Sequence, residues 1–128
     1  MLEVAGLSSR YGRITALDSV SLSVNDGELV ALVGANGAGK ATLLRTLSGV
    51  QPAATGNVRF EGVDVTRVSP RARVRMGIVQ VPEGRQVFGP LTVEDNLRLG
   101  AYVRPATEIA GGLEKVYTLF PILASKRH

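Results

Sequence analysis

The stretch LVGANGAGKATLLRTLSG, residues 32–49, decides how the rest of the sequence is interpreted. It leads from an apolar run, ELVALVG, into a segment with helically spaced leucines, and Gly34, Gly39 and Lys40 between them have P-loop spacing. Such glycines let backbone N–H groups turn toward a phosphate chain, and the helix N-terminus adds partial positive charge. The lysine reaches the terminal phosphates. We therefore predict a phosphate-binding loop at residues 34–40.

One residue departs from the pattern of a Mg²⁺-dependent nucleotide site. The position after Lys40 needs a serine or threonine, whose hydroxyl binds the metal directly, and this sequence has Ala41. Alanine is an excellent helix former, so we expect the helix to be unaffected. Thr42 points elsewhere on the helix and is a poor substitute. We therefore predict ATP binding with a weakened Mg²⁺ site.

Composition excludes several classes of function. The chain has 128 residues, 45% of them hydrophobic, with no cysteine and a single histidine, His128, so disulfides, thiol-based zinc sites and histidine clusters are excluded. The net charge is +4, but the basic residues are scattered apart from RARVR at residues 71–75, without interleaved aromatics. This pattern disfavours nucleic-acid binding. No apolar run reaches membrane-spanning length and no signal-peptide pattern opens the sequence, so we expect a cytosolic protein.

Periodicity predicts alternating strands and helices. LEVAGL and SVSLSV alternate as half-buried strands, and the continuous run ELVALVG is typical of a strand buried on both faces. GNVRF, VDV and GIVQV are predicted as short strands. KATLLRTLSG, SPRARVRM, LTVEDNLRLGAY and EIAGGLEKVYTLF are predicted as helices, with Thr92 and Asp95 as a variant capping box and a Gly111–Gly112 pair weakening the last helix.

Four segments of the sequence resemble the ATP-binding subunits of ABC transporters, in particular those of importers of branched-chain and other hydrophobic amino acids. The matching phrases are LEVAGLSSRYGRITAL, VALVGANGAGK, VPEGRQVF and LTVEDNLRLGAY. The resemblance implies an α/β fold: an incomplete P-loop NTPase core with an N-terminal antiparallel β portion and the start of a helical subdomain. We expect a β-rich core at residues 1–81, a Q-loop-like segment at 82–90 and the helical subdomain from 91 to 128.

The resemblance also implies roles for particular residues. Tyr11 matches the aromatic residue that stacks on adenine. Glu83 occupies the place of a loop glutamine that reaches Mg²⁺ and the attacking water, and is the expected metal ligand. Lys40 and Glu83 are the candidate catalytic residues. The remaining nucleotide contacts fall on the loop and the start of its helix: Gly34, Asn36, Gly37, Ala38, Gly39, Lys40, Ala41 and Thr42.

Partners follow from the same resemblance. Residues 85–104 match the surface that docks the coupling helix of an integral membrane permease, where Phe88, Leu91 and Tyr102 are either contacts or core. A second ATP-binding subunit is expected, with the protein peripheral on the inner face of the membrane. The 128 residues include no LSGGQ-type signature, catalytic glutamate or switch histidine. We therefore interpret them as the N-terminal part of such a subunit and expect no ATP hydrolysis by this chain alone.

Two classes of function remain open from the sequence. The first is an ATP-driven transport subunit, which Lys40 and Tyr11 favour. The second is a non-catalytic nucleotide-binding or assembly module with a vestigial P-loop, which Ala41 favours. A P-loop kinase or GTPase is a weaker third option, because VPEGR and LTVEDNL have no role in those families.

Overall fold

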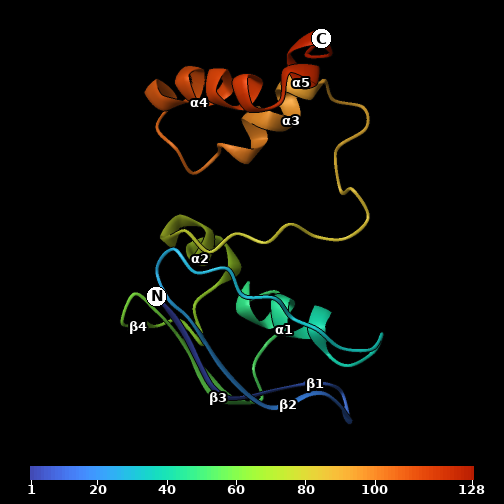
Figure 1. The fold of residues 1–128 in the computed structure, drawn as a ribbon, viewed down its shortest axis with the longest axis vertical. Coiled ribbons are helices and arrows are strands. Elements are labelled where there is room, and N and C mark those ends of the chain that lie inside the picture. The colour runs from blue at the N-terminus through green and yellow to red at the C-terminus, as the bar shows by residue number, and fades with distance from the viewer. The chain divides into compact units, whose positions relative to one another are not determined.

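The computed structural model describes residues 1–128, which divide into two compact units, Met1–Gln80 and Val81–His128. The first contains an antiparallel sheet with two helices, and the second contains three helices (Figure 1). No helix of the chain combines the length and the apolar character needed to cross a membrane.

The sheet of the first unit confirms four of the predicted strands. Strand β1 (Leu2–Tyr11) pairs antiparallel with β2 (Ile14–Val24) on one side and with β3 (Thr55–Phe60) on the other. The short β4 (Val63–Asp64) follows β3 after a tight turn, giving the order β2-β1-β3-β4. Val4, Leu7 and Ser9 of β1 are all buried. Val4 and Leu7 are three residues apart, so they share a face only because the pairing of β1 with β2 is irregular between them.

Helix α1 (Lys40–Leu47) covers one part of this sheet and contacts β1 and β2 (Figure 1). Its Leu43 packs into the core cluster, whereas the adjacent Leu44 is 42% exposed. Helix α2 (Pro70–Met76) begins as predicted, because the Ser69 hydroxyl accepts a hydrogen bond from the Ala72 amide and Pro70 takes the first helical position. The core cluster consists of Val4, Leu7, Leu17, Leu43, Val58 and Val65.

Two predicted strands are absent, and these predictions were wrong. Neither ELVALVG nor GIVQV forms a strand, and Leu29 and Val33 are 97% and 94% exposed. Val79 and Val81 are 73% and 90% exposed. A strand needs neighbouring backbone donors and acceptors, and no strand within residues 1–128 pairs with either segment. Their apolar composition favours a buried strand, but a strand forms only where other strands pair with it.

The second unit consists of α3 (Val93–Gly100), α4 (Ala106–Leu119) and the short α5 (Pro121–Ser125), which the sequence did not predict. Helix α4 continues without interruption through Gly111 and Gly112. Leu113, on α4, is the only buried apolar residue of this unit. Residues 81–92 are irregular, in line with the predicted loop.

Candidate functional site

The predicted phosphate loop is fixed to the sheet at Gly39. This residue has φ +97°, and a Cβ atom there would lie 2.7 Å from the carbonyl oxygen of Ala16 on β2. Any side chain would therefore collide with backbone and would also occupy a conformation that L-residues rarely adopt. Gly37, with φ +83°, supplies a second left-handed turn but meets open space. The two glycines therefore have different roles. Gly37 allows the loop to turn, and Gly39 allows the start of α1 to lie close to the backbone of β2.

Lys40 is the first residue of α1, and its side chain extends back over the loop. Its ammonium group donates hydrogen bonds to the carbonyl oxygens of Gly34 and Ala35, the latter at 2.8 Å. A Cβ atom on Gly34 would lie 3.3 Å from the Cβ atom of Ala38 and at an ordinary contact distance of 3.9 Å from the Lys40 Nζ, so the tight neighbour of Gly34 is Ala38. The sequence motif therefore brings its first glycine and its lysine together at one end of α1.

Several backbone amides of the loop have no acceptor within the chain. The Ala38 amide donates to the Ala35 carbonyl at 3.1 Å, and the first intrahelical bond runs from the Leu43 amide to the Gly39 carbonyl. The amides of Gly37, Gly39, Lys40 and Ala41 donate to no chain acceptor. Free amides at a helix N-terminus beside a lysine ammonium are the donor set that phosphate groups prefer. These residues therefore fit the polyphosphate of a nucleotide.

The residues fit magnesium less well. Ala41 occupies the first turn of α1 and carries no oxygen ligand, and no group of three or more His, Asp or Glu side chains is placed to hold a metal ion. Glu83 is exposed in the irregular segment at the start of the second unit. Its role as a metal ligand or catalytic residue stays a prediction, as does that of Lys40 in catalysis.

The other predicted nucleotide contacts lie in different environments. Tyr11 ends β1 and is 44% exposed, so its ring is accessible to a stacking partner. Thr42 is 9% exposed on α1, and its carbonyl accepts a hydrogen bond from the Thr46 hydroxyl. Asn36 is exposed in the loop. The contacts of these residues with nucleotide stay predictions.

In the second unit, Asn96 holds the segment that precedes α3. Its side-chain oxygen accepts from the Phe88 amide at 2.9 Å, and its side-chain nitrogen donates to the Phe88 carbonyl at 3.1 Å and the Thr92 carbonyl at 2.9 Å. The Phe88 backbone is thus bound on both its polar groups, while its ring is 61% exposed. Leu91 and Tyr102, the other predicted docking residues, are 42% and 56% exposed.

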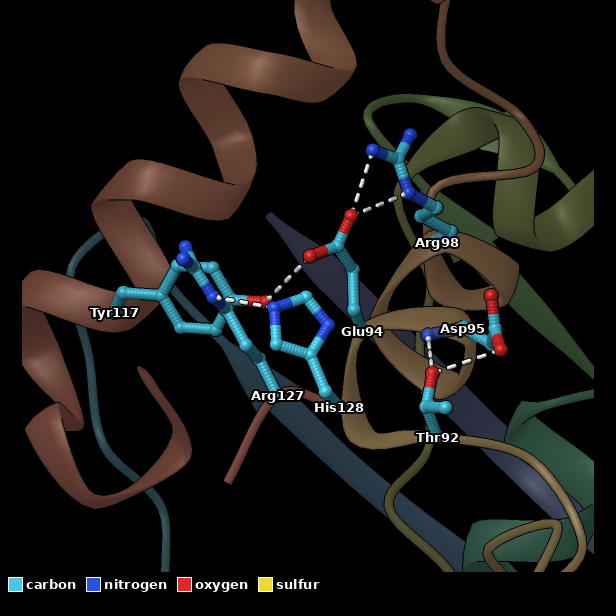
Figure 2. A network of polar contacts seen from close by, with 7 residues as sticks. All are labelled: Thr92, Glu94, Asp95, Arg98, Tyr117, Arg127 and His128. Atoms are coloured by element: carbon cyan, nitrogen blue, oxygen red, sulfur yellow. Dashed lines mark hydrogen bonds and ion pairs between the residues drawn. The ribbon is translucent and has the colours of Figure 1, made fainter. Parts of the chain in front are cut away.

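Polar contacts cap the start of α3 and join α3 to α4 (Figure 2). The Thr92 hydroxyl caps α3 by accepting from the Asp95 amide at 3.0 Å and donates to the Asp95 carboxylate at 2.7 Å. Glu94 accepts from Arg98 at 2.8 Å and from the Tyr117 hydroxyl of α4 at 3.4 Å. The hydrogen bond from Arg98 is the main reason that the pKa of Glu94 lies below its ordinary value. Glu94 therefore links α3 to α4.

Sequence reasoning missed two residues with extensive contacts. Asn96 lies inside a predicted helix, and its side-chain bonds to a loop eight residues earlier have no signature in the sequence. Arg73 belongs to RARVR, where arginines at every second position resemble an exposed basic cluster, yet it is only 2% exposed. No pattern in the sequence singles out the buried arginine from its two neighbours.

The comparisons with known proteins agree with this geometry. The family described as ABC transporter matches residues 17–127. The high-affinity branched-chain amino acid transport ATP-binding protein BraG of Pseudomonas aeruginosa is 44% identical over 126 residues, which are 98% of this chain and 54% of BraG. The sulfate/thiosulfate import ATP-binding protein CysA of Bordetella pertussis is 46% identical over 103 residues, 80% of this chain and 28% of CysA.

A solved structure of an ATP-binding subunit of an ABC transporter is similar throughout the chain. It has a TM-score of 0.79 and 29% identity, and the match covers 99% of this chain and 52% of that one. The chain thus spans about half the length of BraG and of this solved subunit. The fold expected from the resemblance is confirmed. By its sequence match and its fold, the chain belongs to the ABC transporter family.

Proposed function

We propose that this chain is the nucleotide-binding part of an ABC importer subunit that couples ATP binding and hydrolysis to the uptake of branched-chain amino acids. The observation that carries the nucleotide assignment is the set of free amides around Lys40 at the N-terminus of α1. Family membership supplies the context in which such a loop binds ATP.

Each residue of the site has a proposed role. The free amides of Gly37, Gly39, Lys40 and Ala41 and the Lys40 ammonium hold the β- and γ-phosphates. Thr42 contacts an inner phosphate. Tyr11 stacks on the adenine ring. Glu83 orients the attacking water and binds the metal. Magnesium, when bound, neutralises charge that develops on the phosphates, and Ala41 leaves it without its usual direct hydroxyl ligand.

The comparisons support a branched-chain amino acid as the transported substrate more than sulfate. BraG and CysA are similarly identical to the chain, but the BraG match extends over 98% of it and the CysA match over 80%. The proposed partners are a second ATP-binding subunit and an integral membrane permease. The permease would hold the protein on the cytoplasmic face of the membrane and contact Phe88, Leu91 and Tyr102, whose side chains are exposed.

A non-catalytic module that binds nucleotide without turnover is the second candidate. Ala41 is the observation that favours it, because loss of the metal-binding hydroxyl affects hydrolysis more than phosphate binding. The two candidates share the nucleotide site and differ in the response to Mg²⁺.

Titration calorimetry with ATP in the absence of Mg²⁺ tests the nucleotide site. We expect the chain to bind ATP and Lys40→Ala to weaken binding by roughly tenfold or more, since it removes a charge-assisted hydrogen bond to phosphate. Arg45→Ala, which removes an exposed cation from the same helix, is the matched control and should bind normally. Equal affinity in the Lys40 and Arg45 variants would contradict the proposed site.

A deletion strain tests the substrate. Removal of the gene that encodes this chain should abolish high-affinity uptake of radiolabelled leucine and leave sulfate uptake unchanged. The opposite result would assign the chain to an oxyanion importer and leave the ATP site intact.

A further inference from the structure

The buried guanidinium of Arg73 contacts the far end of the helix that carries the phosphate loop. Its Nη1 atom donates to the carbonyl oxygens of Thr46 and Leu47, at 2.9 and 2.7 Å, in the last turn of α1. Nε donates to the Val68 carbonyl at 3.0 Å, and Nη2 donates to the Thr66 carbonyl at 2.9 Å. One side chain on α2 therefore ties α1 to the segment that follows β4.

These contacts complete the hydrogen bonding of the α1 C-terminus. The Leu44 carbonyl accepts from the Ser48 amide and the Arg45 carbonyl from the Gln51 amide. The Thr46 carbonyl accepts hydrogen bonds from the Gly49 amide and from Arg73. The Leu47 carbonyl accepts a hydrogen bond from Arg73 alone. A carbonyl that is shielded from water and has no donor is costly. Arg73 supplies the donor that the Leu47 carbonyl would otherwise lack.

The surroundings of Arg73 are shaped to receive it. Arg73 forms no ion pair, and burial lowers the pKa of its guanidinium from the ordinary value. Gly49 ends α1 with φ +84°, and a Cβ atom there would lie 2.9 Å from Arg73 Nε. A glycine at this position therefore both terminates the helix and leaves space for the guanidinium.

We infer that Arg73 is a positioning residue for ATP: by fixing the C-terminal end of α1, it sets the direction in which the N-terminal end presents its phosphate-binding amides. The two ends of this helix are only ~12 Å apart. Gly39 pins one end against β2, and Arg73 pins the other, so α1 is held at both ends. The positive charge beside the last carbonyls also complements the helix dipole. This inference rests on the proposed function.

Arg73→Met and Arg73→Lys test the inference, with Val65→Ala as control. Val65 is fully buried in the same core but has no polar contact with α1, so its truncation lowers stability without releasing the helix end. Metal-free ATP affinity should fall roughly fivefold in Arg73→Met and less in Arg73→Lys, whose single nitrogen reaches only some of the carbonyls. Val65→Ala should bind ATP as the unchanged chain does, under conditions where each variant is fully folded.

Hydrogen exchange without nucleotide provides the second readout. Amides of residues 43–49 should exchange faster in Arg73→Met than in Val65→Ala when the two have equal global stability. If Arg73→Met does not fold, Arg73→Lys, which keeps a buried cation but fewer of the carbonyl contacts, should show the same pattern in weaker form. Equal loss of ATP affinity or equal exchange in the Arg73 and Val65 variants would overturn the inference. An unchanged chain that binds no ATP would contradict the proposed function, and the exchange comparison would still decide whether Arg73 holds α1.

Discussion

The two units of this chain reach order by different means. In residues 1–80, β1, β2, β3 and α1 converge on a cluster in which Leu7, Val58 and Val65 are fully buried. In residues 81–128, Leu113 is the only buried apolar side chain, and caps, ion pairs and the Asn96 contacts supply most of the specific interactions. The comparison indicates that apolar burial contributes more to the unit with the phosphate loop than to the helical unit, whose described contacts are largely local and polar. Three changes test this difference, and a fourth, at Ala41, tests the nucleotide site that the first unit carries.

The largest effect is expected for Leu7→Ala. Leu7 is fully buried in the core of the first unit, and truncation of such a leucine costs about 2–5 kcal/mol because it removes apolar burial and leaves a cavity. Segment-resolved hydrogen exchange on the whole chain should show the loss in residues 1–80. Leu113→Ala, the equivalent change in the second unit, should cost less, and an equal cost would break the comparison.

The next effect concerns nucleotide. Ala41→Thr should restore a Mg²⁺ ligand, worth roughly 1.5–3 kcal/mol if it resembles a hydrogen bond to a charged group, or roughly ten- to a hundredfold in affinity for Mg²⁺-ATP. Ala41→Val has a similar shape without the hydroxyl and should not gain Mg²⁺ dependence. Calorimetry with and without Mg²⁺ on all three proteins gives the answer. An identical Mg²⁺ response in all three would mean that Ala41 is not the metal position.

A smaller effect is expected at the start of α3. Thr92→Ala removes the hydroxyl that caps the Asp95 amide and should cost about 1 kcal/mol. Exchange of the amides in residues 93–100 should accelerate, while residues 1–80 should not change. Thr92→Ser keeps the capping oxygen and serves as the control. Acceleration in Thr92→Ser as large as in Thr92→Ala would show that the cap is not the cause.

The smallest effect is expected from Glu94. Because Arg98 lowers the pKa of Glu94 from its ordinary value of 4.5, the ionised pair favours the folded unit above that pH. The contribution is lost as the pH falls through the lowered value, where the carboxylate becomes protonated. Glu94→Gln should therefore reduce the acid sensitivity of exchange in residues 93–119 and be close to silent elsewhere, as exposed ion pairs are weak. Unchanged acid sensitivity in Glu94→Gln would assign it to other groups.

Most helices and strands could be predicted from the sequence, but the contacts that each segment makes in the fold could not. Local signals were sufficient for α2 and α3, because Ser69 and Thr92 cap amides three residues further along the chain. They failed at ELVALVG and GIVQV, where a strand depends on backbone partners far along the chain or outside it. The phosphate loop was located by its glycine and lysine spacing, whereas Arg73 was missed because its four acceptor carbonyls come from segments brought together only by folding.

The grip of Asn96 on the Phe88 backbone has a kinetic consequence. An aromatic side chain on a free loop must become ordered when a partner binds, and this ordering slows productive encounter and offsets part of the contact energy. Phe88 is exposed on a backbone whose amide and carbonyl are already bound to α3 through Asn96. A partner that docks on this ring meets a backbone that is already held in place. Its association rate constant is therefore not reduced by a search for the correct loop conformation.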